Sequence, residues 1–269
     1  MTSKKPIKHH YIPKYHINGF GNSNQLYEYD KNRQKINPNP RSPSQLFYQP
    51  NLYTVSVCGQ TTYLIEESYS TFESQLSKLI RKIEDLNSAE FDKLNLNEEF
   101  SNLVKINISI QFWRNPIHEQ LAKIKSEALL ELFDRFYEFN KDVIPFDKKD
   151  VKYLFKKKHK KSIFKFIQFC ILPLLTFKFD GKLPEGFKIL KIREFGYERD
   201  LVCTDNPVCF EQINDEMEFS GYFHFPLTKK LLITNDTGYD FDKIQNVMIE
   251  KAQEKVVGSS IELLNHFFL

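Results

Sequence analysis

The spacing of apolar positions divides the chain into a β-rich start, a helical middle and a β-rich end. Apolar and polar residues alternate over residues 25–30, which is typical of a half-buried strand, and residues 46–48 and 52–57 predict another strand or hairpin. After a proline-rich loop and the helical middle, the β pattern returns in four short segments: 187–193, 201–204, 222–225 and 231–234. We expect the chain to close with a helix over residues 242–257 and a short apolar tail.

The middle of the chain carries helical periodicity. Ile65, Tyr69, Phe72 and Leu76 recur at a spacing that places them on one face of a helix. Where a proline follows, the residue before it is disfavoured in a helix, so Pro116 closes the second of these segments. The pattern predicts about five helices, over residues 62–86, 97–114, 118–139, 148–157 and 162–177.

The order of these elements predicts the architecture. Strands at both ends of a chain need partners, so we expect the terminal segments to build one mixed sheet, with the helical block packed against it. The prediction is a single α+β domain over residues 1–269. Within it, residues 1–60 supply the first strands, 61–180 the helices, and 181–269 the last strands and the closing helix.

Composition and charge narrow the class of protein. The chain is 41% hydrophobic and 27% charged, so it can bury a sizeable core, and a net charge of +3 implies no anionic partner by itself. The most apolar run, 163–179, contains charged residues and a proline, which favours a buried helix over a membrane span. The start has no secretory leader pattern, so we expect a cytoplasmic location and reduced thiols at the four scattered cysteines: Cys58, Cys170, Cys203 and Cys209.

Histidines and aromatic residues crowd the start of the chain, over residues 8–21. Imidazole is the side chain that titrates nearest neutral pH, so this stretch is a candidate for a general base or a metal ligand. A lone histidine is, however, more often a hydrogen-bonded structural residue. In an extended strand His9 and His10 point to opposite faces, so they cannot act as one pair, and we favour His10 over His9.

Two helices carry polar residues beside their apolar stripes. Glu66 and Glu73 lie two turns apart on one face of the first helix, and Gln111 and Arg114 lie on one face of the second. If the faces meet, Arg114 has a carboxylate to pair with. One alternative is a structural ion pair between helices. The other is an acidic cluster that binds a metal or acts as a base, with Arg114 holding a phosphate.

A turn at the end of a predicted strand contains Asp205 and Asn206, followed by Pro207. Both side chains can satisfy backbone donors in a local turn, and that alternative is favoured for Asn206. Loops at strand ends also present catalytic side chains well, so Asp205 is a candidate to orient a histidine or to bind a metal.

The densest charge lies in residues 141–165, which contain ten Lys and three Asp. Such a run is usually a solvated surface, and it is also the usual electrostatic footprint of nucleic-acid binding. Tyr153, Phe155 and Phe164 lie among the lysines and resemble core anchors more than base-stacking residues. The candidate nucleic-acid-binding residues are Lys156, Lys157, Lys158, Lys160 and Lys161.

Six different short motifs follow one another along the chain: residues 9–13 with Phe20, 26–30, 65–66 with 72–73, 111–116, 204–208 and 225–228. Together they resemble a bacterial domain family of unknown function, family 4238. The resemblance implies no established activity. It supports the choice of site residues and the interpretation as one domain, although this chain is richer in lysine and phenylalanine than the family pattern.

The leading hypothesis is a hydrolase or nuclease acting on a nucleic acid or nucleotide, in a toxin or phage-defence setting. A histidine of the opening stretch would be the base or a ligand, Asp205 its orienter, Glu66 a second carboxylate and Arg114 the phosphate clamp, with a divalent metal as one candidate cofactor. No phosphate loop, dinucleotide-binding, zincin or α/β-hydrolase motif is present. The alternative is a non-catalytic module that binds nucleic acid or protein through residues 148–165.

Overall fold

The computed structural model describes residues 8–57, 60–95, 97–214 and 217–269, so Cys58 lies outside the described residues. The protein has the α+β fold expected from its sequence. Its chain forms two compact units. The first contains Met1–Tyr11, Tyr48–Leu76 and Leu96–Lys182, and the second contains Ile12–Phe47, Ser77–Asn95 and Leu183–Leu269.

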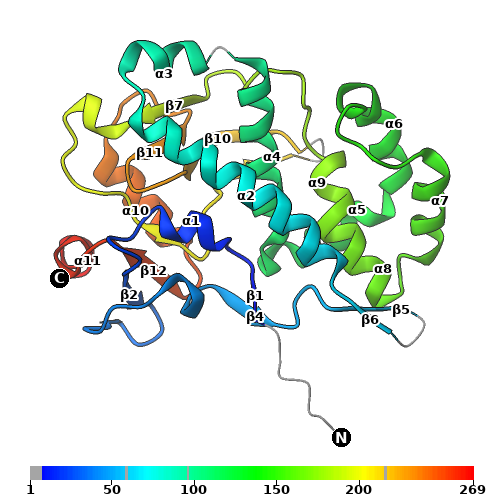
Figure 1. Cartoon of the computed structure of the whole chain (residues 1–269), viewed down its shortest axis with the longest axis horizontal. Coiled ribbons are helices and arrows are strands. Elements are labelled where there is room, and N and C mark those ends of the chain that lie inside the picture. Colours follow the sequence, from blue (N-terminus) through cyan, green and yellow to red (C-terminus); the bar gives the residue numbers. More distant parts are fainter. Residues whose placement is uncertain (1–7, 58–59, 96, 215–216) are drawn as a thin grey trace, which may run out of the picture. The chain divides into compact units, whose positions relative to one another are not determined.

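Helices dominate the first unit, and Figure 1 shows α5 to α9 as a run of green ribbons. The long helix α2 begins in this unit and ends in the second. Within the described residues, no helix has the length and apolar character needed to cross a membrane. The helices are α2 (Leu64–Asp85), α4 (Glu98–Arg114), α5 (Glu119–Glu127), α6 (Leu129–Asn140), α7 (Lys148–Lys157), α8 (Lys161–Phe166) and α9 (Leu172–Leu175), with a 3₁₀ turn η2 (Pro116–His118).

Two of the predicted helices are interrupted. Residues 118–139 form α5 and α6, which meet at Ala128, whose backbone angles (φ −101°, ψ 19°) are not helical. Residues 162–177 form α8 and α9 joined by a π-helical segment η3 (Ile167–Ile171). Pro173 has no N–H to donate to the carbonyl of Phe169 four residues earlier, and the hydroxyl of Tyr69 donates to that carbonyl instead, at 2.5 Å.

The strands of the first unit form two small antiparallel sheets. Strand β1 (Lys8–His10) pairs with β4 (Tyr48–Pro50), which places His9 opposite Gln49. A hairpin joins β5 (Val55–Val57) and β6 (Gln60–Thr62). The opening stretch leaves the extended conformation after His10, and Lys14–Asn18 is helical.

Two four-stranded sheets form the second unit, and all of their pairings are antiparallel. The predicted joining of N- and C-terminal strands is present in the sheet β3-β2-β12-β8. The prediction of one mixed sheet is wrong, because the strands are distributed among separate antiparallel sheets. The strands are β2 (Tyr27–Asp30), β3 (Lys35–Ile36), β7 (Lys188–Lys191), β8 (Cys203–Thr204), β9 (Cys209–Ile213), β10 (Phe219–Pro226), β11 (Leu231–Thr234) and β12 (Lys255–Gly258).

The predicted closing helix ends earlier than residue 257. Its first part is α10, which stops at Lys251, where the ammonium of Lys31 donates to the carbonyls of residues 249, 250 and 252 at 2.9, 3.2 and 2.7 Å. Val256 and Val257 then lie in β12, because two buried β-branched residues suit a central strand. The helices of this unit are α1 (Lys14–Asn18), α3 (Ser88–Asn95), α10 (Phe241–Lys251) and α11 (Ile261–Phe268), with 3₁₀ turns η1 (Pro43–Gln45) and η4 (Ile192–Phe195).

Candidate functional site

The predicted site residues are divided between the units. Asp205 and Asn206 belong to the second unit. The first unit contains the remaining predicted positions, which are His9, His10, Glu66, Glu73, Gln111, Arg114 and the lysines between 156 and 161. Each group is therefore described within its own unit.

Arg114 is the centre of a buried network in the first unit. It occupies the last position of α4 and is only 2% exposed. Its Nε donates to the carbonyl oxygen of His10 at 2.9 Å and to the hydroxyl of Tyr53 at 2.7 Å. Its Nη1 forms an ion pair with Glu73, which confirms the predicted pairing, and its guanidinium lies 4.4 Å from the ring centre of Tyr69.

These contacts determine the charge of the network. Burial alone would lower the pKa of Arg114. The interactions with Tyr53 and Glu73 outweigh burial and raise this pKa above its usual value, so the guanidinium stays charged. Burial raises the pKa of Tyr53, so its phenol stays protonated and donates to the carbonyl of His10 at 3.1 Å. A buried charge needs a partner and hydrogen bonds, and Arg114 has both. This arrangement matches the structural alternative and leaves the guanidinium no exposed surface for a phosphate.

His9 lies on the same network and is fully buried. Its ring stacks on Tyr53, with 5.3 Å between ring centres and 10° between planes, and its Nδ1 accepts a hydrogen bond from the backbone N–H of Tyr53 at 2.7 Å. Burial, followed by the charges of Lys165 and Arg114, lowers the pKa of His9, so the ring is neutral with its proton on Nε2. Within the described residues, Nε2 has no hydrogen-bond partner.

Three further predicted residues lie near this network. His10 joins it through its main-chain carbonyl, while its ring packs against Tyr48 at 5.8 Å. Glu66 lies in the first turn of α2, where its charge acts on the phenol of Tyr53. Gln111 is fully buried on α4 and donates to the side-chain oxygen of Asn107, one turn earlier, at 3.2 Å. The catalytic roles of His10 and Glu66 and the supporting role of Gln111 stay predictions.

Asp205 fastens the connection between α10 and β12 in the second unit. Its carboxylate accepts hydrogen bonds from the backbone N–H groups of Gln253, Glu254 and Lys255, at 2.8, 2.7 and 3.0 Å. Burial raises the pKa of Asp205, and these three donors oppose the shift. Asn206 donates to the carbonyl of Lys251 at 3.3 Å. Both side chains thus act as backbone partners, as the turn alternative predicts.

A metal site would need several ligating side chains in one place. Across the described parts of the chain, no group of three or more His, Cys, Asp and Glu residues has such an arrangement. Burial raises the pKa of the Cys203 and Cys209 thiols, which disfavours the thiolate form that binds metals. The described residues therefore offer no set of ligands that would support the predicted divalent metal.

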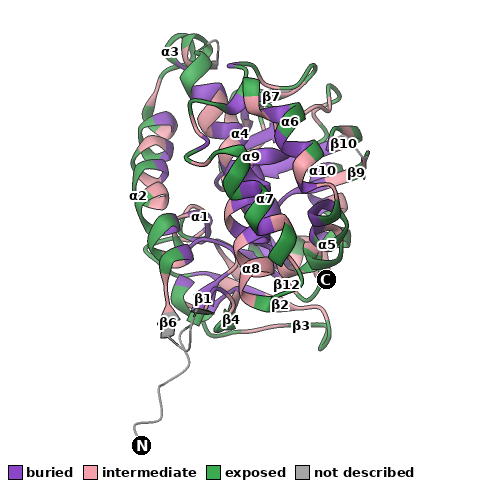
Figure 2. Cartoon of the chain, turned by 90° about the vertical axis from the view of Figure 1, so that its right-hand side faces the viewer, coloured by how far each residue is buried: buried purple, intermediate pink, exposed green. Residues whose placement is uncertain are grey.

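The basic segment begins with a well-formed helix. Asp147 caps α7 by accepting hydrogen bonds from the backbone N–H groups of Lys149 and Asp150, at 2.7 and 3.0 Å. Val151 and Leu154 are buried and attach the helix to the core. Phe155 is half-buried, and the other positions are charged except for Tyr153 and, as the green colour of α7 in Figure 2 indicates, exposed.

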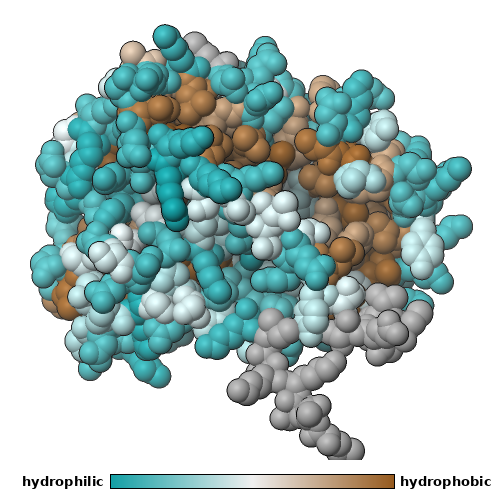
Figure 3. All heavy atoms as spheres, viewed as in Figure 1, coloured by the Kyte–Doolittle hydropathy of each residue, from teal (hydrophilic) through white to brown (hydrophobic). Residues whose placement is uncertain are grey.

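We call the exposed lysines of α7 after Lys148, of its connection to α8 and of the first position of α8 the basic face. None of them forms an ion pair with another described residue, whereas Lys148 pairs with Asp134 and Lys158 with Glu127. Hydrophilic side chains gather at the right-hand edge of Figure 3, where Figure 1 places α7. The basic face consists of Lys149, Lys152, Lys156, Lys157, Lys160 and Lys161.

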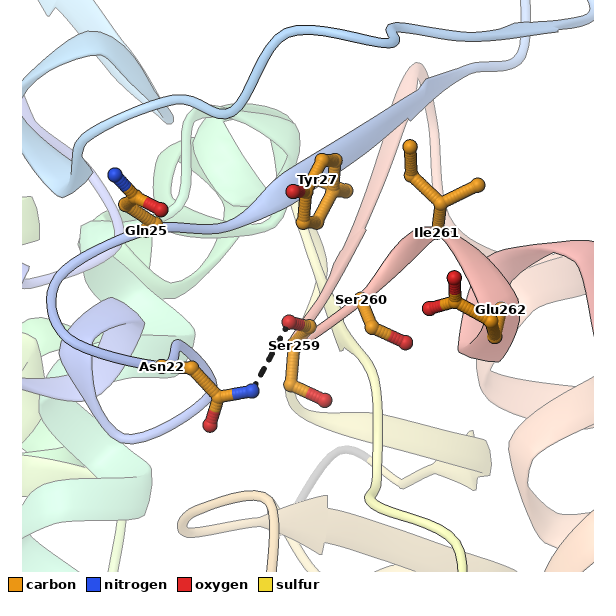
Figure 4. A pocket seen from close by; sticks show the side chains of 7 residues that line it. All are labelled: Asn22, Gln25, Tyr27, Ser259, Ser260, Ile261 and Glu262. Atoms are coloured by element: carbon orange, nitrogen blue, oxygen red, sulfur yellow. Dashed lines mark hydrogen bonds between the residues drawn. The ribbon is translucent and has the colours of Figure 1, made fainter.

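The second unit has a pocket of about 240 Å³ beside the N-terminus of α11. Figure 4 shows Tyr27 and Glu262 among the side chains around it, with Asn22 donating to the carbonyl of Ser259 at 3.2 Å. The N-terminus of a helix favours a bound anion, but here the carboxylate of Glu262 already supplies negative charge in the first turn of α11. The pocket is lined by Asn22, Gln25, Tyr27, Ser259, Ser260, Ile261 and Glu262.

The class of protein is thus an α+β protein whose first unit combines a buried arginine network with an exposed basic face. The chain belongs to a family described as "Protein of unknown function (DUF4238)", whose profile matches residues 8–169. The matched range includes the whole arginine network and the basic face, and the family resemblance expected from the motifs is confirmed. Comparisons with curated proteins and with solved structures found no match.

Proposed function

We propose that this protein binds nucleic acid through the basic face of α7 and α8. The observation that carries the proposal is the set of exposed lysines, none of which has a carboxylate partner among the described residues. A phosphate backbone supplies the missing negative charges. Binding releases the counterions of the phosphates, which makes such contacts favourable at low salt.

The contacts of α7 favour a nucleic acid over a membrane surface. A helix that lies on a membrane inserts its apolar face between the lipids. The apolar face of α7 is occupied, because Val151 and Leu154 are buried in the protein core. Only the charged face of the helix is available to a partner.

The test is a salt titration of oligonucleotide binding, followed by fluorescence anisotropy. Replacing Lys156, Lys157 and Lys160 together by glutamine should weaken binding and reduce the slope of log K against log salt. Each phosphate contact contributes about 0.7 to 0.9 to that slope, so the triple variant should lose roughly 2.

The matched control replaces three exposed lysines outside the basic face by glutamine: Lys78, Lys82 and Lys93. This variant has the same change of net charge, and its affinity and slope should stay near the wild-type values. Equal losses in both variants, or no loss in the first, would show that the basic face is not the binding surface.

Hydrolysis of the bound nucleic acid is a second candidate, favoured by one observation on His9. Its Nε2–H is a buried donor without an acceptor among the described residues, and a phosphate oxygen is a suitable acceptor only in a state that opens the first unit and exposes this fully buried ring. In this protonation state His9 donates a hydrogen bond and does not act as a base. Product analysis of a labelled oligonucleotide, with His9→Gln as the variant, tests this candidate. Turnover that persists in His9→Gln would exclude a role for His9.

A further inference from the structure

We infer that the basic face takes a single strand, and that Tyr153 stacks on one of its bases. This inference rests on the proposed nucleic-acid binding and goes further, because it names the form of the ligand and the residue that recognises it. Tyr153 lies on α7 and is 59% exposed. It forms no ring contact or hydrogen bond with the other described residues.

The position of Tyr153 on α7 places it among the lysines of the basic face. Residues three and four positions apart are neighbours on a helix surface, so Tyr153 lies next to Lys149, Lys156 and Lys157. At 1.5 Å per residue, Lys149 and Lys157 are about 12 Å apart along the helix axis. That length accommodates a few phosphates, with the ring between them.

Tyr153 differs from the other two aromatic residues of this segment. Phe155 is half-buried beneath the ammonium of Lys158, which lies 3.9 Å from its ring centre. Phe164 is also half-buried. Both rings are thus partly covered by the protein. The sequence grouped Tyr153 with them as a core anchor, which is wrong for Tyr153: the buried positions of α7 are Val151 and Leu154, so the ring of Tyr153 is left in solvent.

Stacking on an exposed ring requires a base that is free of its own neighbours. Bases in a duplex are stacked on each other and paired, so a duplex offers this surface only its phosphates. A single strand offers phosphates to the lysines and a base face to Tyr153, a combination used by proteins that bind single strands without sequence preference. An acidic protein would satisfy the lysines but has no row of planar bases between its charges to stack on the ring.

The experiment compares Tyr153→Leu with Tyr153→Phe. Leucine keeps an apolar side chain and removes the aromatic face, whereas phenylalanine keeps the ring and removes only the hydroxyl. The probe is a fluorescein-labelled DNA of mixed sequence and about 12 nucleotides, used single-stranded, as a duplex, and as a single strand with abasic sites. Because Tyr153 is exposed, both variants should fold, and circular dichroism checks this.

Tyr153→Leu should weaken binding of the single strand by about 5- to 150-fold, the effect expected from losing one stacked base. It should leave duplex binding unchanged, and it should leave binding of the abasic strand unchanged. Tyr153→Phe should bind the single strand as the wild type does. Loss of affinity for all three probes in Tyr153→Leu would contradict the inference.

The two proposals fail in different ways. If the triple glutamine variant at Lys156, Lys157 and Lys160 binds every probe as the wild type does, the proposed function is wrong. If that variant binds weakly while Tyr153→Leu binds the single strand normally, the basic face is a nucleic-acid surface but the stacking inference is wrong. Displacement of the probe by polyglutamate as efficiently as by unlabelled single strand would also overturn the inference.

Discussion

Tyr53→Phe removes one hydroxyl from the centre of the arginine network and should destabilise the first unit by about 2 kcal/mol. The hydroxyl accepts from Nε of Arg114 at 2.7 Å and donates to the carbonyl of His10 at 3.1 Å. A hydrogen bond to a charged group contributes about 1.5–3 kcal/mol and a neutral one about 0.5–1.5 kcal/mol. The loss is reduced because Nε of Arg114 keeps its own bond to His10 and neither group is left unsatisfied.

The assay is equilibrium unfolding in urea, followed through the fluorescence of the one tryptophan. Trp113 belongs to the first unit, is fully buried and donates to the hydroxyl of Thr176 at 2.7 Å, so its emission reports unfolding of that unit. Tyr153→Phe is the matched control, because it removes an exposed hydroxyl and should leave the free energy of unfolding unchanged. A loss below about 0.5 kcal/mol for Tyr53→Phe would refute the assignment of these hydrogen bonds as stabilising.

Three more predictions concern other parts of the fold. Lys31→Met should lower the stability of the second unit by about 1 kcal/mol in thermal unfolding, because the carbonyls that end α10 lose a charged donor. Tyr69→Phe should cost less stability in a Pro173→Ala background, where residue 173 regains an N–H for the carbonyl of Phe169, and a double-mutant cycle in urea measures that coupling. Burial lowers the pKa of His16 to about 3, so between pH 7 and pH 5 the unfolded chain binds a proton at this residue, near the usual pKa of 6.5, and the folded chain does not. The contribution of His16 to stability should therefore fall by about 2 kcal/mol over that range. In urea unfolding His16→Gln should lose less stability than the wild type by that amount, while the buried His224 of the same unit, with its pKa lowered to about 4, keeps its own contribution in both proteins.

Helices were predicted from the sequence better than the limits of strands. The prediction for α7 has the observed bounds, because its apolar residues, its Asp147 cap and the following lysines all agree on one element. The break at Ala128 was missed, since its neighbours continue the helical periodicity on both sides. Residues 252–257 were assigned to a helix because apolar spacing alone does not distinguish a helix end from a short buried strand.

The candidate site was predicted in part. Helical spacing brought Arg114 and Glu73 together correctly, because each lies on a regular face whose direction follows from the period. Tyr53 and Tyr69 were missed, because Tyr69 was counted in the apolar face of a helix and Tyr53 only as part of the strand predicted over residues 52–57. A signal for them exists, since a buried tyrosine hydroxyl needs a hydrogen-bond partner and a buried arginine needs acceptors. The sequence alone does not show which tyrosine hydroxyl lies beside which arginine.

The division of α2 between the two units limits which parts of the protein can be produced as separate fragments. Each unit is assembled from three separate chain segments, and the chain passes from one unit to the other within α2. A fragment cut at the end of the family match, at residue 169, would lose α9, and with it the proline that shapes the π-helical segment. Neither unit can be produced as one continuous piece of the polypeptide. Folding intermediates of this protein should therefore contain long open loops. All segments of the first unit are present once Lys182 has been synthesised, whereas the second unit also needs the segment from Leu183 to Leu269.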